Sequence, residues 1–74
     1  MQKVKLVEEL RAACNGAPSG DKVVTVHLFA IENADRLREE NLHDLAERAG
    51  IGRSFGTELR KGLRLSTHVQ LKQL

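Results

Sequence analysis

A glycine-interrupted segment in the second half of the chain, LAERAGIGRSFGTELRKG (residues 45–62), constrains the fold more than any other feature of the sequence. Apolar residues recur at helical spacing before the interruption, and they do so again after it. Gly50 can adopt the left-handed backbone conformation that ends a helix without a side-chain clash. The segment therefore predicts two short helices, over about 42–49 and about 53–61, that meet at a sharp turn.

Two helices are also expected in the first half of the chain. Leu6 and Leu10 recur four residues apart with charged residues between them, which predicts an amphipathic helix over about 3–14. The stretch after Asp21 begins with β-branched residues, as a strand does, but its apolar residues recur at helical spacing and it is long for a strand. We therefore expect a helix over about 22–39, with Asp21 as its N-cap and an apolar first half that makes it the central element of the core.

The residues on either side of the glycine turn have defined roles in this prediction. Asn41 can cap the helix over about 42–49, and Ile51 can fold back onto the core after the turn. Gly62 is expected to follow the last predicted helix. The buried face of the helix over 42–49 is expected to hold Leu42, Leu45, Ala46 and Ala49.

The C-terminal end fits two structures equally well. Residues 66–74 can form a last helical turn, since Ser66 can cap it, or a short strand in which apolar residues alternate. In either case the apolar residues of this end are expected to cover the core; they are Leu63, Leu65, Val69 and Leu71. The predicted fold is a single all-α domain over residues 1–74, with four to five helices and a possible short C-terminal strand.

The composition excludes several classes of protein. A chain of 74 residues can build only one core, and 41% apolar residues are enough to fill it. Cys14 is the only cysteine, so no internal disulfide can form and a reducing compartment is expected. Two Phe without Tyr or Trp give no stacking platform for single-stranded nucleic acid. No apolar run approaches the roughly 20 residues of a membrane span, so we expect a soluble, cytoplasmic protein with no membrane partner.

Charge is distributed unevenly along the chain. Residues 1–50 hold seven Lys or Arg and nine Asp or Glu, a balance of −2, whereas residues 51–74 hold five and one, a balance of +4. Such an asymmetry suggests that the C-terminal third faces an anionic partner, although solvated basic residues on a small helix would give the same pattern.

Two short helices joined by a glycine-containing turn are the arrangement of the helix-turn-helix motif. The segment resembles the Cro/repressor type of this motif over about residues 41–65, through Leu45, Ala46, Ala49, Gly50, Ile51, Ser54, Leu59 and Gly62. The whole chain is also similar to short bacterial proteins described as HTH-like domain proteins, a family for which no biochemical role follows from the resemblance.

The repressor resemblance implies a surface that contacts duplex DNA. In that family the second helix of the motif lies in the major groove, and its early residues touch base edges. Carried over by position, the outward face would hold Gly52, Arg53, Ser54, Thr57, Glu58 and Lys61. Attraction to phosphates that does not depend on DNA sequence would come from Arg60, Arg64 and Lys72.

Three residues depart from the repressor pattern. Gly56 stands where the family places an aliphatic core residue, so we expect either that another backbone comes close to it or that Phe55 turns inward as a replacement anchor. Glu58 would repel phosphates on the outward face unless it reads a cytosine amino group. Arg60 stands where an acidic residue is common. These departures weaken the expectation of base-specific reading more than that of the fold.

The sequence holds no recognisable site for catalysis. His27, His43 and His68 have no Cys or carboxylate partners at the spacing of a metal site, and His27 is expected to be a packed or boundary residue. The stretch GIGRSFG lacks the Lys-Ser/Thr ending of a phosphate loop. We therefore expect no enzyme activity, no cofactor and no metal. The alternative to DNA binding is a protein-interaction module that keeps the motif as a packing unit, and the apolar C-terminal end is the natural candidate for a homodimer surface.

Overall fold

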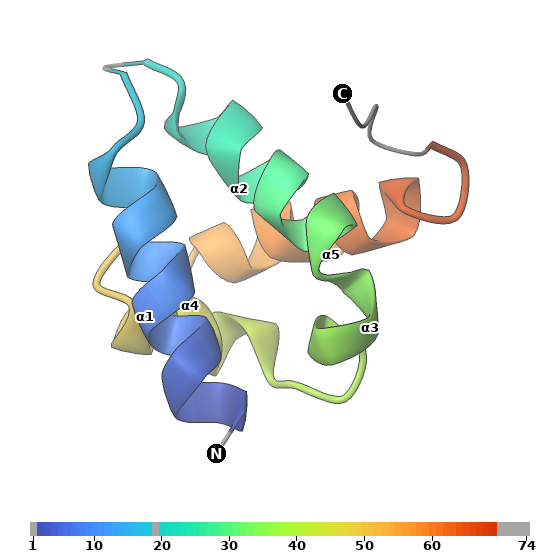
Figure 1. Ribbon diagram of the computed structural model, residues 1–74, viewed down its shortest axis with the longest axis horizontal. Coiled ribbons are helices and arrows are strands. Elements are labelled where there is room, and N and C mark those ends of the chain that lie inside the picture. Colours follow the sequence, from blue (N-terminus) through green and yellow to red (C-terminus); the bar gives the residue numbers. More distant parts are fainter. Residues whose placement is uncertain (1, 19, 70–74) are drawn as a thin grey trace.

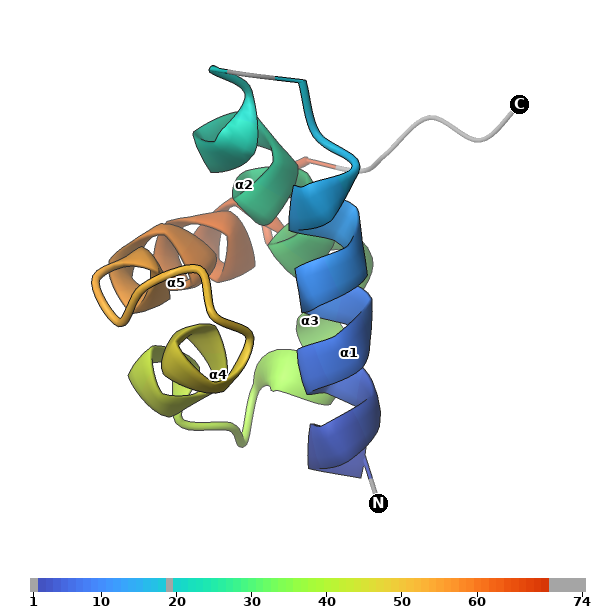
Figure 2. The same cartoon turned by 90° about the vertical axis from the view of Figure 1, so that its left-hand side faces the viewer.

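The computed structural model describes residues 2–18 and 20–69, and this part of the chain forms five α-helices and no strand. The helices are α1 (Gln2–Asn15), α2 (Lys22–Glu32), α3 (Ala34–Leu37), α4 (Leu42–Arg48) and α5 (Phe55–Leu65). Figure 1 shows α2 crossing over α5, with α1 along one side of the molecule. Figure 2 shows α4 and α5 together on the side opposite α1. The predicted all-α fold is confirmed.

Every helix contributes a fully buried leucine or valine to one core. The largest fully buried side chains are Leu6, Leu10, Val26, Leu37, Leu45 and Leu59. Removing such a side chain from water stabilises the fold by about 1.5–3 kcal/mol, which is how helices too short to persist alone are held in place. The predicted buried face of α4 is confirmed, since Leu42, Leu45, Ala46 and Ala49 are all buried. Ile51 also folds back onto the core as expected.

The prediction of one long helix over 22–39 is wrong, because the helix is interrupted at Asn33. Both the backbone N–H and the side-chain Nδ2 of Asn33 donate to the carbonyl oxygen of Phe29, at 3.0 Å each. A side chain that bonds the backbone in this way competes with continuation of the helix. The Oδ1 atom of Asn33 then accepts a hydrogen bond from Arg36 at 2.9 Å, which ties the break to the four residues of α3.

The start of α2 also differs from the prediction. Asp21 precedes the helix, but its side chain makes no capping hydrogen bond. The expectation that the apolar first half of α2 is buried holds for Val26, Phe29 and Ala30 alone, because Val24 and Leu28 are about half exposed at 54% and 46%. One face of α2 packs on the core, and Val24 and Leu28 are open to solvent on its opposite face.

Helix α5 begins and ends later than predicted. Arg53 and Ser54 form a tighter turn ahead of it, in which the N–H of Phe55 donates to Gly52 and that of Gly56 to Arg53, each at 3.0 Å. The helix continues to Leu65, so Gly62 lies inside it rather than after it. Glycine is the poorest helix former after proline, so a sequence reading ends the helix there. Packing against α2 overrides that preference.

The C-terminal end covers less of the core than predicted. Leu63 is half-buried and packs against the core, but Leu65 and Val69 are 42% and 47% exposed. Residues 66–69 follow α5 without forming a strand. The prediction of a strand over the remaining residues, and the roles expected for Leu71 and Lys72, lie outside the described part of the chain.

Candidate nucleic-acid interface

The turn between α4 and α5 is built by hydrogen bonds that suit its glycines. Gly50 has a φ of +79°, as predicted, and its N–H donates to Glu47 at 3.1 Å. The N–H of Ile51 reaches back to Ala46 at 3.2 Å. This pair of bonds is a Schellman motif, which satisfies the last carbonyls of a helix and directs the chain away from it. Gly52 has a φ of +108° and turns the chain a second time, into α5.

The start of α4 is capped as predicted. The Oδ1 atom of Asn41 accepts a hydrogen bond from the N–H of Asp44 at 3.0 Å. Asp44 in turn lies 3.0 Å from Arg48, one helical turn later. A cap and an acidic residue in the first turn both stabilise a seven-residue helix that has little stability of its own.

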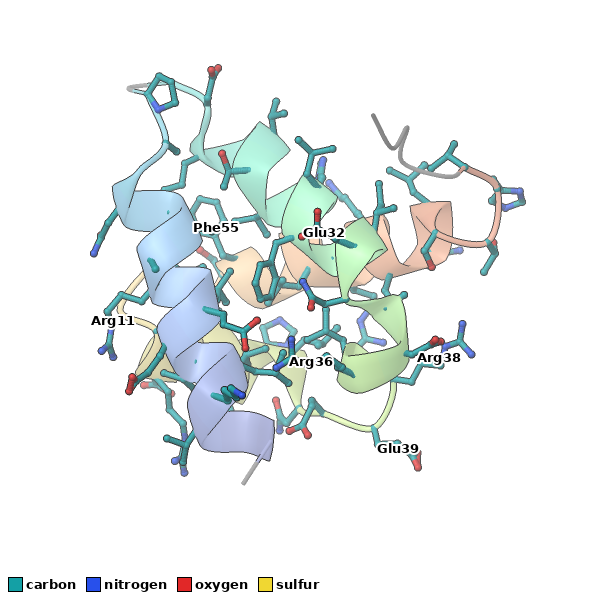
Figure 3. All side chains as sticks on the ribbon, viewed as in Figure 1. Arg11, Glu32, Arg36, Arg38, Glu39 and Phe55 are labelled. Atoms are coloured by element: carbon teal, nitrogen blue, oxygen red, sulfur yellow. The ribbon has the colours of Figure 1, made fainter. Side chains whose placement is uncertain are left out.

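A side chain on α1 fixes the other end of α4. The guanidinium of Arg11 donates to the carbonyl oxygens of Arg48 at 2.8 Å and Ala49 at 3.3 Å. Figure 3 shows the Arg11 side chain extending outward from α1. A cation at a helix C-terminus satisfies free carbonyls and interacts favourably with the helix dipole. No sequence pattern reveals this contact, because the partners are 38 and 37 residues apart.

Two glycines let α5 pack directly against its neighbours. A Cβ on Gly56 would lie 2.6 Å from the Cα of His43 in α4. A Cβ on Gly62 would lie 2.6 Å from the Cβ of Ala30 and 2.8 Å from the carbonyl oxygen of His27, both in α2. The predicted close approach at Gly56 is therefore confirmed. Phe55 also packs against the core, with Lys22 Nζ 5.1 Å from the centre of its ring.

Glu58 does not lie on the outward face where the repressor resemblance puts it. Its Oε1 atom is 2.8 Å from Nε2 of His27, and its side chain is only 24% exposed in the junction between α2 and α5. The hydrogen bond from His27 is the main cause that lowers the pKa of Glu58, and Lys61, 3.5 Å away, lowers it further. His27 is a boundary residue, as expected. The expected conflict between Glu58 and phosphates is therefore smaller than the resemblance implies, because the carboxylate is turned toward His27 and is paired with Lys61.

We call the exposed side of α5 and of the turn before it the outer face. All the other predicted contact residues that the structure describes are exposed there; they are Gly52, Arg53, Ser54, Thr57, Arg60, Lys61 and Arg64. Helical spacing places Thr57, Arg60 and Arg64 along one stripe of the helix, opposite the buried Leu59. Since Glu58 is the only acidic residue after Glu47, α5 contributes no carboxylate to this face.

The four cations of the outer face differ in their partners. Arg53 pairs with Glu47 of α4 at 3.1 Å, and Lys61 pairs with Glu58 at 3.5 Å. Arg60 and Arg64 have no ion pair with any residue in the described ranges. They stand one helical turn apart, a spacing at which like charges destabilise an isolated helix by roughly 0.2–0.5 kcal/mol. The helix therefore carries two neighbouring positive charges that no carboxylate of residues 2–18 or 20–69 pairs with.

The structure gives no basis for a metal site or a membrane span within residues 2–18 and 20–69. No three His, Cys, Asp or Glu side chains gather closely enough there to hold an ion. No helix of this part combines the length and the apolar character that a membrane crossing needs.

An all-α domain in which a capped helix, a glycine turn and a second helix pack on a shared core is a helix-turn-helix domain. The chain belongs to the family described as HTH-like domain, whose family model matches residues 2–72. No curated protein and no solved structure matches it.

Proposed function

We propose that this protein binds duplex DNA through the outer face of α5, with α5 entering the major groove as in the Cro/repressor type. The observation that carries the proposal is the inward turn of Glu58 toward His27, which leaves α5 with Arg60, Lys61 and Arg64 at its surface and no outward carboxylate. A face of this kind attracts the phosphate backbone.

The shape of the site fits the same partner. The major groove is about 12 Å wide and admits one α-helix. Nothing in the described part of the chain covers the outer face, and Figure 2 shows α5 at the edge of the molecule, away from α1. Ser54 and Thr57 bring hydroxyl groups that can contact phosphates or bases beside the cations. Such binding fits a small transcription regulator, which is the role we propose.

Salt-dependent binding to a mixed-sequence duplex tests this function. By fluorescence anisotropy, log K is expected to fall linearly with log salt, because each neutralised phosphate releases counterions. The variant Arg60→Ala/Lys61→Ala should bind at least about tenfold more weakly. The control Lys5→Ala/Arg38→Ala removes the same charge from α1 and from the end of α3, and it should change binding by less than about twofold. Absence of binding at low salt, or equal losses in the two variants, would refute the proposal.

A second candidate function, binding to another protein, is favoured by the apolar face of α2. Val24 and Leu28 lie one turn apart on this face and are both about half exposed. A homodimer formed through this face can be tested without identifying another partner protein. Sedimentation equilibrium should then show a mass that rises with concentration for the wild type and stays monomeric for Leu28→Glu. A monomeric wild type at high concentration would exclude the homodimer.

A further inference from the structure

We infer that Arg60 and Arg64, with Thr57, make the primary phosphate contacts of the protein, and that Arg53 and Lys61 contribute much less. The inference rests on the proposed DNA binding and names the part of the outer face that carries it. The repressor resemblance gives Arg60 and Arg64 only a general attraction to phosphates and puts the base contacts on the residues that begin the helix, whereas this inference makes Arg60 and Arg64 the main direct contacts.

The first argument is the difference in ion pairing. The guanidinium of Arg53 lies 3.1 Å from Glu47, and the ammonium of Lys61 lies 3.5 Å from Glu58. A phosphate must compete with these carboxylates for each cation. Arg60 and Arg64 have no such competitor in the described part of the chain, so their full charge is available to a phosphate.

The second argument is position. Thr57, Arg60 and Arg64 follow one another at spacings of three and four residues, so their side chains line one stripe of α5. All three are exposed. Two guanidinium groups and a hydroxyl along one stripe match consecutive oxygens of a nucleic-acid backbone, and guanidinium is the side chain best suited to a phosphate because it can donate two parallel hydrogen bonds.

The third argument is the repulsion within the stripe. Arg60 and Arg64 are like charges one turn apart, and no counter-charge of the described residues relieves them. An anion bound between them removes this repulsion, whereas an anion at Arg53 or Lys61 must first separate an existing ion pair. Anion binding is therefore more favourable at Arg60 and Arg64 than at Arg53 or Lys61.

The test compares two double variants that remove equal charge from the same face. Arg60→Ala/Arg64→Ala deletes the two cations that have no ion pair among the described residues, and Arg53→Ala/Lys61→Ala deletes the two that have one. Binding of each variant to a mixed-sequence duplex is measured over a range of salt concentrations, after circular dichroism has shown that each remains folded. Both variants lose two positive charges, so their net charge changes equally. A difference between their DNA affinities therefore reports direct contact.

The slope of log K against log salt is the deciding readout. It should decrease in magnitude by about 1.8 for Arg60→Ala/Arg64→Ala, because each lost phosphate contact accounts for about 0.9. The decrease for Arg53→Ala/Lys61→Ala should be less than half as large. An equal or larger decrease for the second variant would overturn the inference while the proposed function stands. A wild type that does not bind duplex DNA would overturn both.

Binding to duplex RNA of the same sequence tests whether the protein recognises duplex DNA or any nucleic-acid backbone. The major groove of A-form RNA is too deep and narrow for a helix, so the wild type should bind duplex RNA more weakly than DNA by at least about tenfold. Equal affinity for both duplexes would contradict a contact made by α5 inside the groove.

Discussion

Glu58 Oε1 lies 2.8 Å from Nε2 of His27, and this contact joins α5 to α2. It has two consequences. It stabilises the packing of the helix that carries the outer face, and it removes the only carboxylate of that helix from the surface that we propose for DNA.

The first prediction concerns pH. The pKa of Glu58 is lowered from 4.5, mainly by the hydrogen bond from His27, so the folded protein favours the ionised carboxyl more than the unfolded chain does. The resulting stabilisation is complete above pH 4.5 and is lost as the pH falls through the lower folded-state pKa. Glu58→Gln should therefore lower the melting temperature at neutral pH, and the difference from wild type should shrink in acid.

The control for this prediction is Glu39→Gln, since Glu39 projects away from the fold (Figure 3). Its melting temperature should follow that of the wild type at both pH values. A difference for Glu58→Gln that is the same at neutral and acid pH would show that the carboxylate is not the cause.

The second prediction concerns the helix crossing at Gly62. In Gly62→Ala the new Cβ would lie 2.8 Å from the carbonyl oxygen of His27, a backbone atom that cannot turn aside. Overpacking of this kind costs about 1–3 kcal/mol, and alanine gains roughly 1 kcal/mol over glycine in a helix, so the net loss is up to about 2 kcal/mol. Urea unfolding should show a net loss of stability. Gly16→Ala is the matched control, because its Cβ would meet nothing closer than 3.6 Å and its stability should not fall.

The third prediction concerns the left-handed residue of the turn. Gly50 has a φ of +79° and open space where a Cβ would lie. Gly50→Ala should therefore lose about 1–2 kcal/mol from backbone strain alone. Gly50→Asn should lose less, because asparagine tolerates this conformation better than alanine does. Equal losses in urea unfolding would contradict strain as the cause.

The fourth prediction concerns the contact of α1 with the end of α4. Arg11→Ala removes the hydrogen bonds to the carbonyl oxygens of Arg48 and Ala49, one of which is 2.8 Å long. The loss should be about 0.5–1.5 kcal/mol for an intramolecular hydrogen bond of ordinary strength. Hydrogen exchange should quicken at the amides of residues 49–51 more than in α2. Uniform quickening across the chain would instead indicate a loss of global stability.

Local signals predicted the motif well and the packing around it poorly. Asn41 as a cap, Gly50 as a left-handed residue and Ile51 as a residue that folds back onto the core depend on neighbours a few residues away, and such preferences can be read from the sequence. The interruption of the helix at Asn33 could not be predicted in the same way, because apolar residues keep their helical spacing on both sides of it.

The candidate site shows the same division. The repressor resemblance implies an outward position for Arg53, Thr57 and Lys61, and all three side chains are exposed. The inward turn of Glu58 depends on His27, which is 31 residues away, and helical spacing carries no information about such a partner. Long-range contacts also explain why Gly62 lies inside α5. Because glycine has no side chain, Ala30 can pack closely against the helix at this position.

The most direct measurement of the central claim is residue-by-residue mapping of amide NMR shifts while a mixed-sequence DNA duplex is added at low salt. DNA binding by the outer face predicts shift changes concentrated in residues 52–65, largest around Arg60 and Arg64, with little change in α1. Unchanged spectra, or changes centred on α1 or on the apolar face of α2, would contradict it.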